Sequence, residues 1–160
     1  MAGHIVRLGG LIAALLVSLA AVPGCGKGGP KLVPVRGKVT LNDGTPVKYG
    51  HVILHADASK GNTTKEVSQG TIRNGDYTIM TGAREGAPPG AYRVSIEAAD
   101  EVDENNPYFT KWFADEKYVN PDTSGLTTVV AENPEPGRYD FKLDPHPPQV
   151  DPFNPKGKKK

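Results

Sequence analysis

The chain of 160 residues has room for one domain of ordinary size, and its formal net charge of +1 creates no field that attracts nucleic acid or a strongly acidic partner. Its 19 glycines and 15 prolines favour a domain with many turns over a helical bundle. The single cysteine, Cys25, excludes an intrachain disulfide and any metal site built from several cysteines.

Residues 1–24 have the composition of a secretory signal peptide. Arg7 provides a short basic start, residues 8–22 are apolar and carry no charge, and small residues follow. This run of about fifteen residues would span only about 22 Å as a helix, less than the roughly 30 Å hydrocarbon core of a bilayer. We therefore expect a cleaved signal rather than a transmembrane helix.

The apolar run ends at Val22-Pro23-Gly24-Cys25. This ending resembles the lipobox of bacterial lipoproteins. In that motif an apolar residue and two small residues precede a cysteine; Val22, Gly24 and Cys25 match it, and Pro23 departs from the usual alanine or serine. The resemblance implies that the Cys25 thiol is diacylglycerylated, that the signal is cut before it, and that the new amino group is open to acylation. Two or three acyl chains anchor a protein stably, whereas one does so only marginally. The alternative is an ordinary signal cut near residues 20 and 21, with Cys25 left as a free thiol.

Residues 25–33 are expected to form a flexible linker after the lipidated cysteine, because residues 26–30 are mostly glycine and offer nothing to bury. The predicted location is therefore the bacterial cell envelope. The chain would be lipid-anchored to a membrane, with its domain exported to the periplasm or the cell surface.

From residue 34 onward, apolar and polar residues alternate, which is the pattern of half-buried β-strands. Asn74-Gly75 predicts a hairpin, and residues 42–44 and 89–90 predict turns. No segment shows a long helical period, and residues 108–117 allow at most a short helix. The predicted strands lie at residues 35–41, 51–56, 65–73, 77–80, 91–97, 126–130 and 138–143.

Short strands that each have one apolar face must bury those faces against one another, and two packed sheets achieve this economically. We predict an all-β fold, a Greek-key β-sandwich of about seven strands over residues 34–144. Residues 145–160 are expected to be a disordered tail, since they are rich in proline and lysine. The alternative for this tail is a basic tether to anionic cell-wall polymer or lipid.

Short turn and core motifs occur at residues 35–39, 44–47, 52–54, 74–79, 89–94, 124–127 and 139–143. They resemble carboxypeptidase regulatory-like domains, whose fold is a transthyretin-like (prealbumin-like) β-sandwich. The resemblance covers most of residues 35–143 and rests chiefly on turn and core residues, so it implies a fold and names no ligand. In the later segments it is closest to a variant found in small bacterial lipoproteins.

The sequence carries no recognised catalytic motif: a nucleophile elbow, a phosphate-binding loop and a zinc-binding helix motif are all missing. His51 and His55 lie four residues apart on one predicted strand, so they face the same side about 13 Å apart, too far to share a metal ion. The acidic residues within 100–104 are an alternative calcium site, although their spacing matches no EF-hand loop. We predict no enzymatic activity, no catalytic residue, no metal site and no cofactor.

Residues 106–118 concentrate aromatic side chains in one long connection. Exposed aromatic rings on a loop stack on sugars or grip a partner, which makes Tyr108, Phe109, Trp112 and Phe113 the candidate ligand-binding residues. The alternative is that the connection folds back, caps one open end of the sandwich and buries most of these rings.

The sequence thus predicts a non-catalytic envelope lipoprotein. Its β-sandwich would make structural or adhesive contacts with envelope proteins or glycans, and its partners would include the membrane, through Cys25, but no nucleic acid. The alternative is a carbohydrate- or small-ligand-binding module that uses the aromatic loop at residues 106–118.

Overall fold

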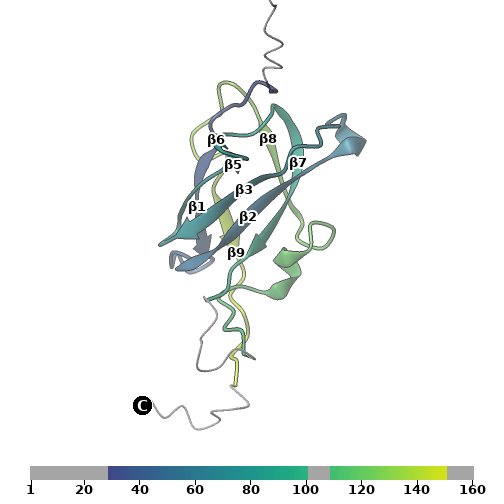
Figure 1. The fold of residues 1–160 in the computed structure, drawn as a ribbon. Helices are drawn as coiled ribbons and strands as arrows, with labels where there is room; N and C mark the ends of the chain where they lie inside the picture. The colour runs from purple at the N-terminus through teal and green to yellow at the C-terminus, as the bar shows by residue number, and fades with distance from the viewer. Residues whose placement is uncertain (1–28, 101–108, 151–160) are drawn as a thin grey trace, which may run out of the picture.

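The computed structural model describes residues 29–100 and 109–150 (Figure 1). Cys25, the predicted signal, Tyr108 and residues 151–160 lie outside this range. The described residues form β-strands and two short 3-10 helices, η1 (Ala58–Lys60) and η2 (Glu116–Val119), with no α-helix. None of the helices in the described ranges is long and apolar enough to cross a membrane. The prediction of an all-β fold is confirmed.

The described part of the chain contains nine strands, and each of the seven predicted strand segments overlaps at least one of them. The short β5 and β6 form an additional hairpin. The strands are β1 (Arg36–Leu41), β2 (Tyr49–Ala56), β3 (Ser68–Arg73), β4 (Asp76–Thr78), β5 (Met80–Thr81), β6 (Arg84–Glu85), β7 (Gly90–Glu97), β8 (Leu126–Val130) and β9 (Phe141–Leu143).

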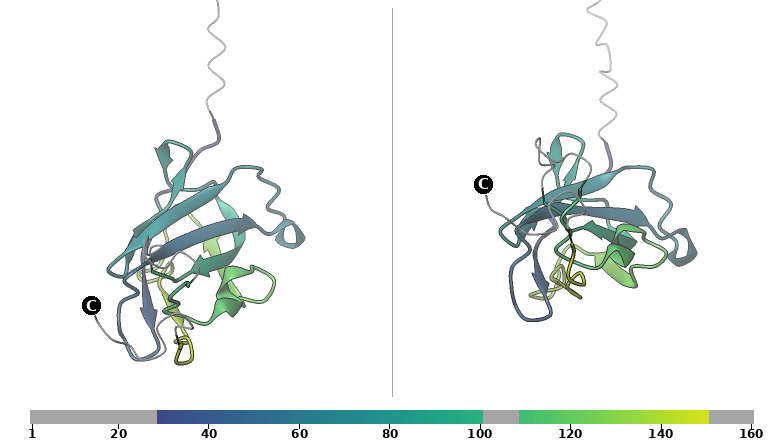
Figure 2. Two further views of the ribbon diagram at one scale, coloured as in Figure 1. Left: turned by 60° about the horizontal axis from the view of Figure 1, so that its bottom comes forward. Right: turned by 90° about the horizontal axis from the view of Figure 1, so that it is seen from below.

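The strands form one mixed sheet in the order β8-β7-β2-β3-β4-β1-β9, which curls until it is nearly closed into a barrel (Figures 1 and 2). All neighbouring pairs are antiparallel except β1 and β9, which are parallel. The short β5 pairs with the far end of β3, and β6 pairs with β5.

The continuity of the sheet differs from the two packed sheets that the sequence predicts, and β1 provides the physical reason. Its first half, residues 36–38, pairs with β4, whereas its second half, residues 39–41, pairs with β9. Because β1 pairs with β4 along one half and with β9 along the other, backbone hydrogen bonding continues from β4 through β1 to β9. In two separate packed sheets, each sheet would have a free edge at this position.

The Asn74-Gly75 turn between β3 and β4 is present as predicted. Both residues have positive φ, 50° for Asn74 and 90° for Gly75, and Arg73 pairs with Asp76 across the turn. This is the conformation that asparagine and glycine adopt most readily, so the local sequence and the hairpin agree.

The last strand is shorter than the predicted segment 138–143. The backbone of residues 135–140 forms turns instead, in which the Arg138 N–H donates to the Glu135 carbonyl (3.1 Å) and the Asp140 N–H donates to the Gly137 carbonyl (3.0 Å). Local hydrogen bonds thus replace the strand ladder until Phe141, although Tyr139 in this segment is buried.

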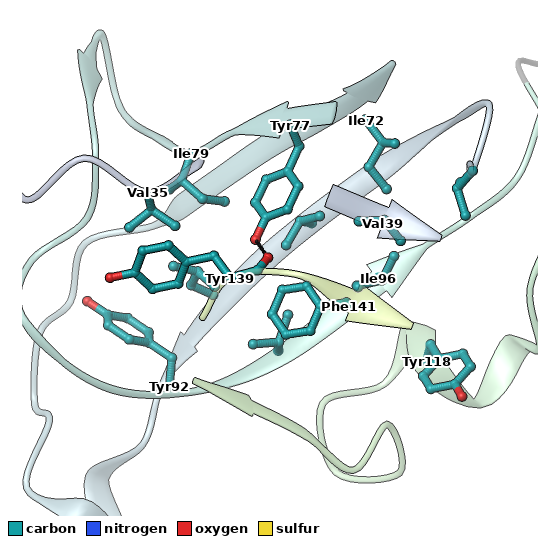
Figure 3. Packing of buried hydrophobic residues seen from close by; sticks show 14 of the residues in the cluster. Val35, Val39, Ile72, Tyr77, Ile79, Tyr92, Ile96, Tyr118, Tyr139 and Phe141 are labelled. Atoms are coloured by element: carbon teal, nitrogen blue, oxygen red, sulfur yellow. Dashed lines mark hydrogen bonds between the residues drawn. The ribbon is translucent and has the colours of Figure 1, made fainter. Parts of the chain in front are cut away.

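The inner face of the curled sheet encloses a single cluster of apolar side chains (Figure 3). The Tyr77 and Phe141 rings stack with their centroids 6.3 Å apart. The buried tyrosine hydroxyls are hydrogen-bonded: that of Tyr77 donates to the Tyr139 carbonyl (2.6 Å) and that of Tyr92 donates to the Pro88 carbonyl (2.7 Å). Fully buried members from the strands include Val39, Val52, Ile72, Tyr92, Val94 and Leu143.

The two ends of the described chain lie at opposite ends of the domain (Figure 1). The first described residues, coloured purple, are at the top of that view, and among them Val33 pairs with Ala87 through hydrogen bonds of 2.9 and 3.0 Å. Residues 144–150 are at the bottom. Val33 is buried, so the ordered domain begins inside the segment that the sequence assigns to the linker.

Candidate functional site

The bottom of the domain is built from three extended segments, residues 98–100, 111–114 and 144–149. Ala99 pairs with Trp112, and Ala114 pairs with Pro145. The Phe113 N–H donates to the Ala98 carbonyl (2.8 Å), and the His146 N–H donates to the Phe113 carbonyl (3.0 Å). Residues 145–149, which the sequence assigns to the tail, therefore form part of the ordered structure.

The Gln149 side chain links the last of these segments to the backbone of residues 110–112. Its Oε1 accepts the Trp112 backbone N–H (2.7 Å), and its Nε2 donates to the Thr110 carbonyl (3.1 Å). One amide side chain thus satisfies a backbone donor and a backbone acceptor, as a neighbouring strand would.

The structure separates the candidate aromatic residues into two groups. Phe113 packs against the core cluster, and Tyr118 is 6% exposed and belongs to it. Phe109 and Trp112 are half-buried and are not part of that cluster. They line a surface hollow of about 300 Å³, the loop hollow, whose other walls include His146, Pro147, Pro148 and Gln149.

Asp144 fixes the base of the loop. Its carboxylate accepts hydrogen bonds from Lys117 Nζ (2.5 Å), from the Tyr118 hydroxyl (3.0 Å) and from Asn42 Nδ2 (2.5 Å). These donors, Lys117 first, hold the pKa of Asp144 below its usual value. The Asp115 carboxylate accepts the Lys117 N–H (2.8 Å) and thereby caps the N-terminus of η2.

The histidines lie apart from this loop or are already bonded. His51 and His55 both lie on the outer face of β2; His55 Nε2 is 2.8 Å from Ser95 Oγ, and burial lowers the pKa of His55. His146 Nε2 is 3.4 Å from a Glu116 carboxylate oxygen. Within residues 29–100 and 109–150, no group of three or more His, Cys, Asp or Glu side chains is arranged to hold a metal ion.

A second hollow, which the sequence analysis did not identify, lies on the outer face of the sheet. This sheet hollow has a volume of about 410 Å³. Alternation along the strands predicts which residues point outward, but the hollow depends on how β2, β3, β4 and β5 lie next to one another. Its principal lining residues are His51, Val67, Gln69, Thr71, Thr78 and Met80.

Comparison of the chain with protein-family models, with curated proteins and with solved structures found no match, so the two hollows and the chain's own sequence are the basis for a functional proposal.

Proposed function

We propose that the chain is a non-catalytic lipoprotein of the bacterial cell envelope, anchored through acyl groups on Cys25. The observation that carries this proposal is the position of the only cysteine directly after an apolar run of signal-peptide length. The β domain would then make structural or adhesive contacts with envelope proteins or glycans.

The arrangement of the domain supports such a display role. The first described residues lie at the top of the domain, whereas residues 144–149, several of which line the loop hollow, lie at the bottom (Figure 1). An anchor at Cys25 would therefore hold the end that carries the loop hollow away from the membrane. Confinement to a surface raises the effective concentration of the domain there, which strengthens weak contacts.

We also propose that the domain is related to carboxypeptidase regulatory-like, transthyretin-like domains, as a Greek-key sandwich whose two layers are joined into one sheet through β1. The supporting residues are Asn74 and Gly75, which form the turn that the resemblance implies, and Tyr77 and Tyr92, which lie in the core. A crystal structure with strand connections that differ from a Greek key would contradict this assignment.

The anchor is tested by expressing the full-length chain and its Cys25→Ser variant in a bacterial host. The native chain is expected to sediment with membranes and to incorporate labelled palmitate, and the variant to lose both properties because it lacks the acylated thiol. Ser18→Ala, inside the apolar run, serves as the matched control and should behave as the native chain. Unchanged membrane association of Cys25→Ser would contradict the lipid anchor.

A second candidate function is binding of carbohydrate or another small ligand by the loop at residues 106–118. The favouring observation is that the half-buried Phe109 and Trp112 line one hollow. Trp112 is the only tryptophan, so its fluorescence reports on this site without labelling. Soluble peptidoglycan fragments and polysaccharides are expected to quench it, and Phe109→Ala should remove the response while leaving the fluorophore in place. Native fluorescence that no member of such a panel changes would count against this function.

A further inference from the structure

The sheet hollow brings together outward-facing side chains from neighbouring strands. On β2 and β3, His51 lies opposite Thr71; on β3 and β5, Gln69 lies opposite Met80. Thr78 enters from β4 beside them. Within residues 29–100 and 109–150, the ribbon views show no other segment lying over this face of β2 and β3 (Figures 1 and 2).

Four polar side chains in this hollow have unused hydrogen-bonding capacity. His51, Gln69, Thr71 and Thr78 make no side-chain hydrogen bond to any residue in the described part of the chain. Each can both donate and accept, because an imidazole, an amide and two hydroxyls are all bifunctional. The loop hollow is different, since its Gln149 and His146 side chains are already bonded to the protein.

The sheet hollow also has an apolar wall. Val67 is 65% exposed and Met80 is 37% exposed, and both belong to its lining. Small-ligand sites commonly combine apolar surface with a few convergent polar groups, in volumes of roughly 300–1,000 Å³. The sheet hollow, at about 410 Å³, has this composition and size.

The charge of the lining selects among ligand classes. None of the residues that line the hollow is a lysine, arginine, aspartate or glutamate, and His51 is the only titratable side chain among them. An anionic ligand would find no cation there, and a metal ion would find no carboxylate. An uncharged molecule with many hydroxyl groups and an apolar C–H face matches both parts of the lining, and a sugar ring is such a molecule.

We propose that the sheet hollow is a binding site for an uncharged glycan. Sugar hydroxyls exchange hydrogen bonds with His51, Gln69 and Thr71, and the C–H face of the ring lies on Met80 and Val67. This site is distinct from the aromatic loop and does not depend on the lipid anchor, so the proposal extends beyond the function proposed above.

The test is calorimetric titration of the full-length chain, kept in a zwitterionic detergent without a sugar headgroup, with short uncharged oligosaccharides of glucose, mannose, galactose and N-acetylglucosamine. At least one of these probes is expected to bind. Thr71→Val and Gln69→Met keep the side-chain size and remove the polar groups, so each should weaken that binding about tenfold, equivalent to about 1.4 kcal/mol.

Thr127→Val is the matched control, because Thr127 is exposed on β8 and does not line the hollow. It should bind as the native chain does, and thermal unfolding should show that all variants fold. Failure of every uncharged probe to bind would overturn the proposal. Binding that survives Thr71→Val and Gln69→Met but is lost in Phe109→Ala would also overturn it and would assign the glycan to the loop hollow. Release of Cys25→Ser from membranes bears only on the anchor, so the two proposals fail independently.

Discussion

At the scale of residues, Tyr139 connects parts of the barrel that are distant in sequence. Its carbonyl accepts the Tyr77 hydroxyl, and its own hydroxyl accepts the Ala131 N–H just after β8 (3.4 Å). Gly37 of β1 approaches so closely that a Cβ there would lie 2.1 Å from the Tyr139 carbonyl oxygen. This one residue therefore contacts β4, β1 and the end of β8, where the barrel comes nearest to closing.

Removing the Tyr77 hydroxyl should destabilise the protein. In Tyr77→Phe the buried Tyr139 carbonyl loses its side-chain donor, which we expect to lower the free energy of unfolding by about 1–3 kcal/mol. Urea denaturation of the purified protein measures this change. Tyr49→Phe is the control, since Tyr49 is half-exposed and its hydroxyl forms no hydrogen bond within the described residues. Equal stability of the two variants would show that the Tyr77 hydrogen bond contributes nothing.

The same hydroxyl should make stability depend on alkaline pH. Burial raises the pKa of Tyr77 in the folded state, chiefly through desolvation. Its contribution is therefore fully present below the unfolded-state pKa of about 10, and it falls at higher pH by about 1.4 kcal/mol per unit, because only the unfolded chain releases the proton. Tyr77→Phe should lose stability less steeply than the native chain between about pH 9 and 11. Parallel curves for the two proteins would contradict this.

The contact at Gly37 leads to a further prediction. Gly37→Ala forces its Cβ against a backbone atom, so we expect a loss of about 1–3 kcal/mol or more, measured as a lower Tm. Gly44→Ala separates this steric effect from backbone strain. Gly44 has a φ of 87° but open space around its Cβ position, and its substitution should cost only about 1 kcal/mol. A larger loss at Gly44 than at Gly37 would refute the steric explanation.

At the scale of elements, residues 144–149 act as an added strand that completes the loop. A chain that ends at Asp144 keeps the Lys117 and Tyr118 contacts but lacks the Pro147, Pro148 and Gln149 wall beside Trp112. We expect Trp112 emission to shift to longer wavelength as its ring becomes more exposed. Tm should change little, because the removed residues lie outside the core cluster. A chain that ends at Val150 is the control, and identical emission from both chains would show that the segment does not shield Trp112.

The elements also differ in how far local sequence predicts them. The strands and the Asn74-Gly75 hairpin depend on alternation and turn chemistry within a few residues, and the sequence predicts them. Residues 138–140 contain apolar and polar residues in the same alternation, yet they form turns, because local hydrogen bonds to Glu135 and Gly137 compete with the strand ladder. Periodicity alone cannot distinguish these outcomes.

At the scale of the whole molecule, the proposed anchor and the loop hollow would belong to opposite ends of the domain. Arg84 lies beside Gly29 at the end where the linker enters, whereas Thr110 lies beside Gln149 at the other end. Fluorophores attached to Arg84→Cys or Thr110→Cys in the anchored full-length chain should therefore respond differently to a quencher embedded in the bilayer. We expect stronger quenching at position 84. Equal quenching at the two positions would contradict an orientation in which the loop hollow faces away from the membrane.

The all-β class, the Asn74-Gly75 hairpin and the inward-facing apolar residues were open to prediction because each depends on a short stretch of sequence. The signal and the lipidation site within the first 25 residues stay a prediction. The change of partner along β1, the pairing of residues 144–149 with residues 111–114, and the two hollows required the tertiary structure. Each of these brings together residues from distant parts of the chain. Such partners are selected by the packing of the complete core, and a local pattern specifies only that a strand has an apolar face, not which strand lies beside it.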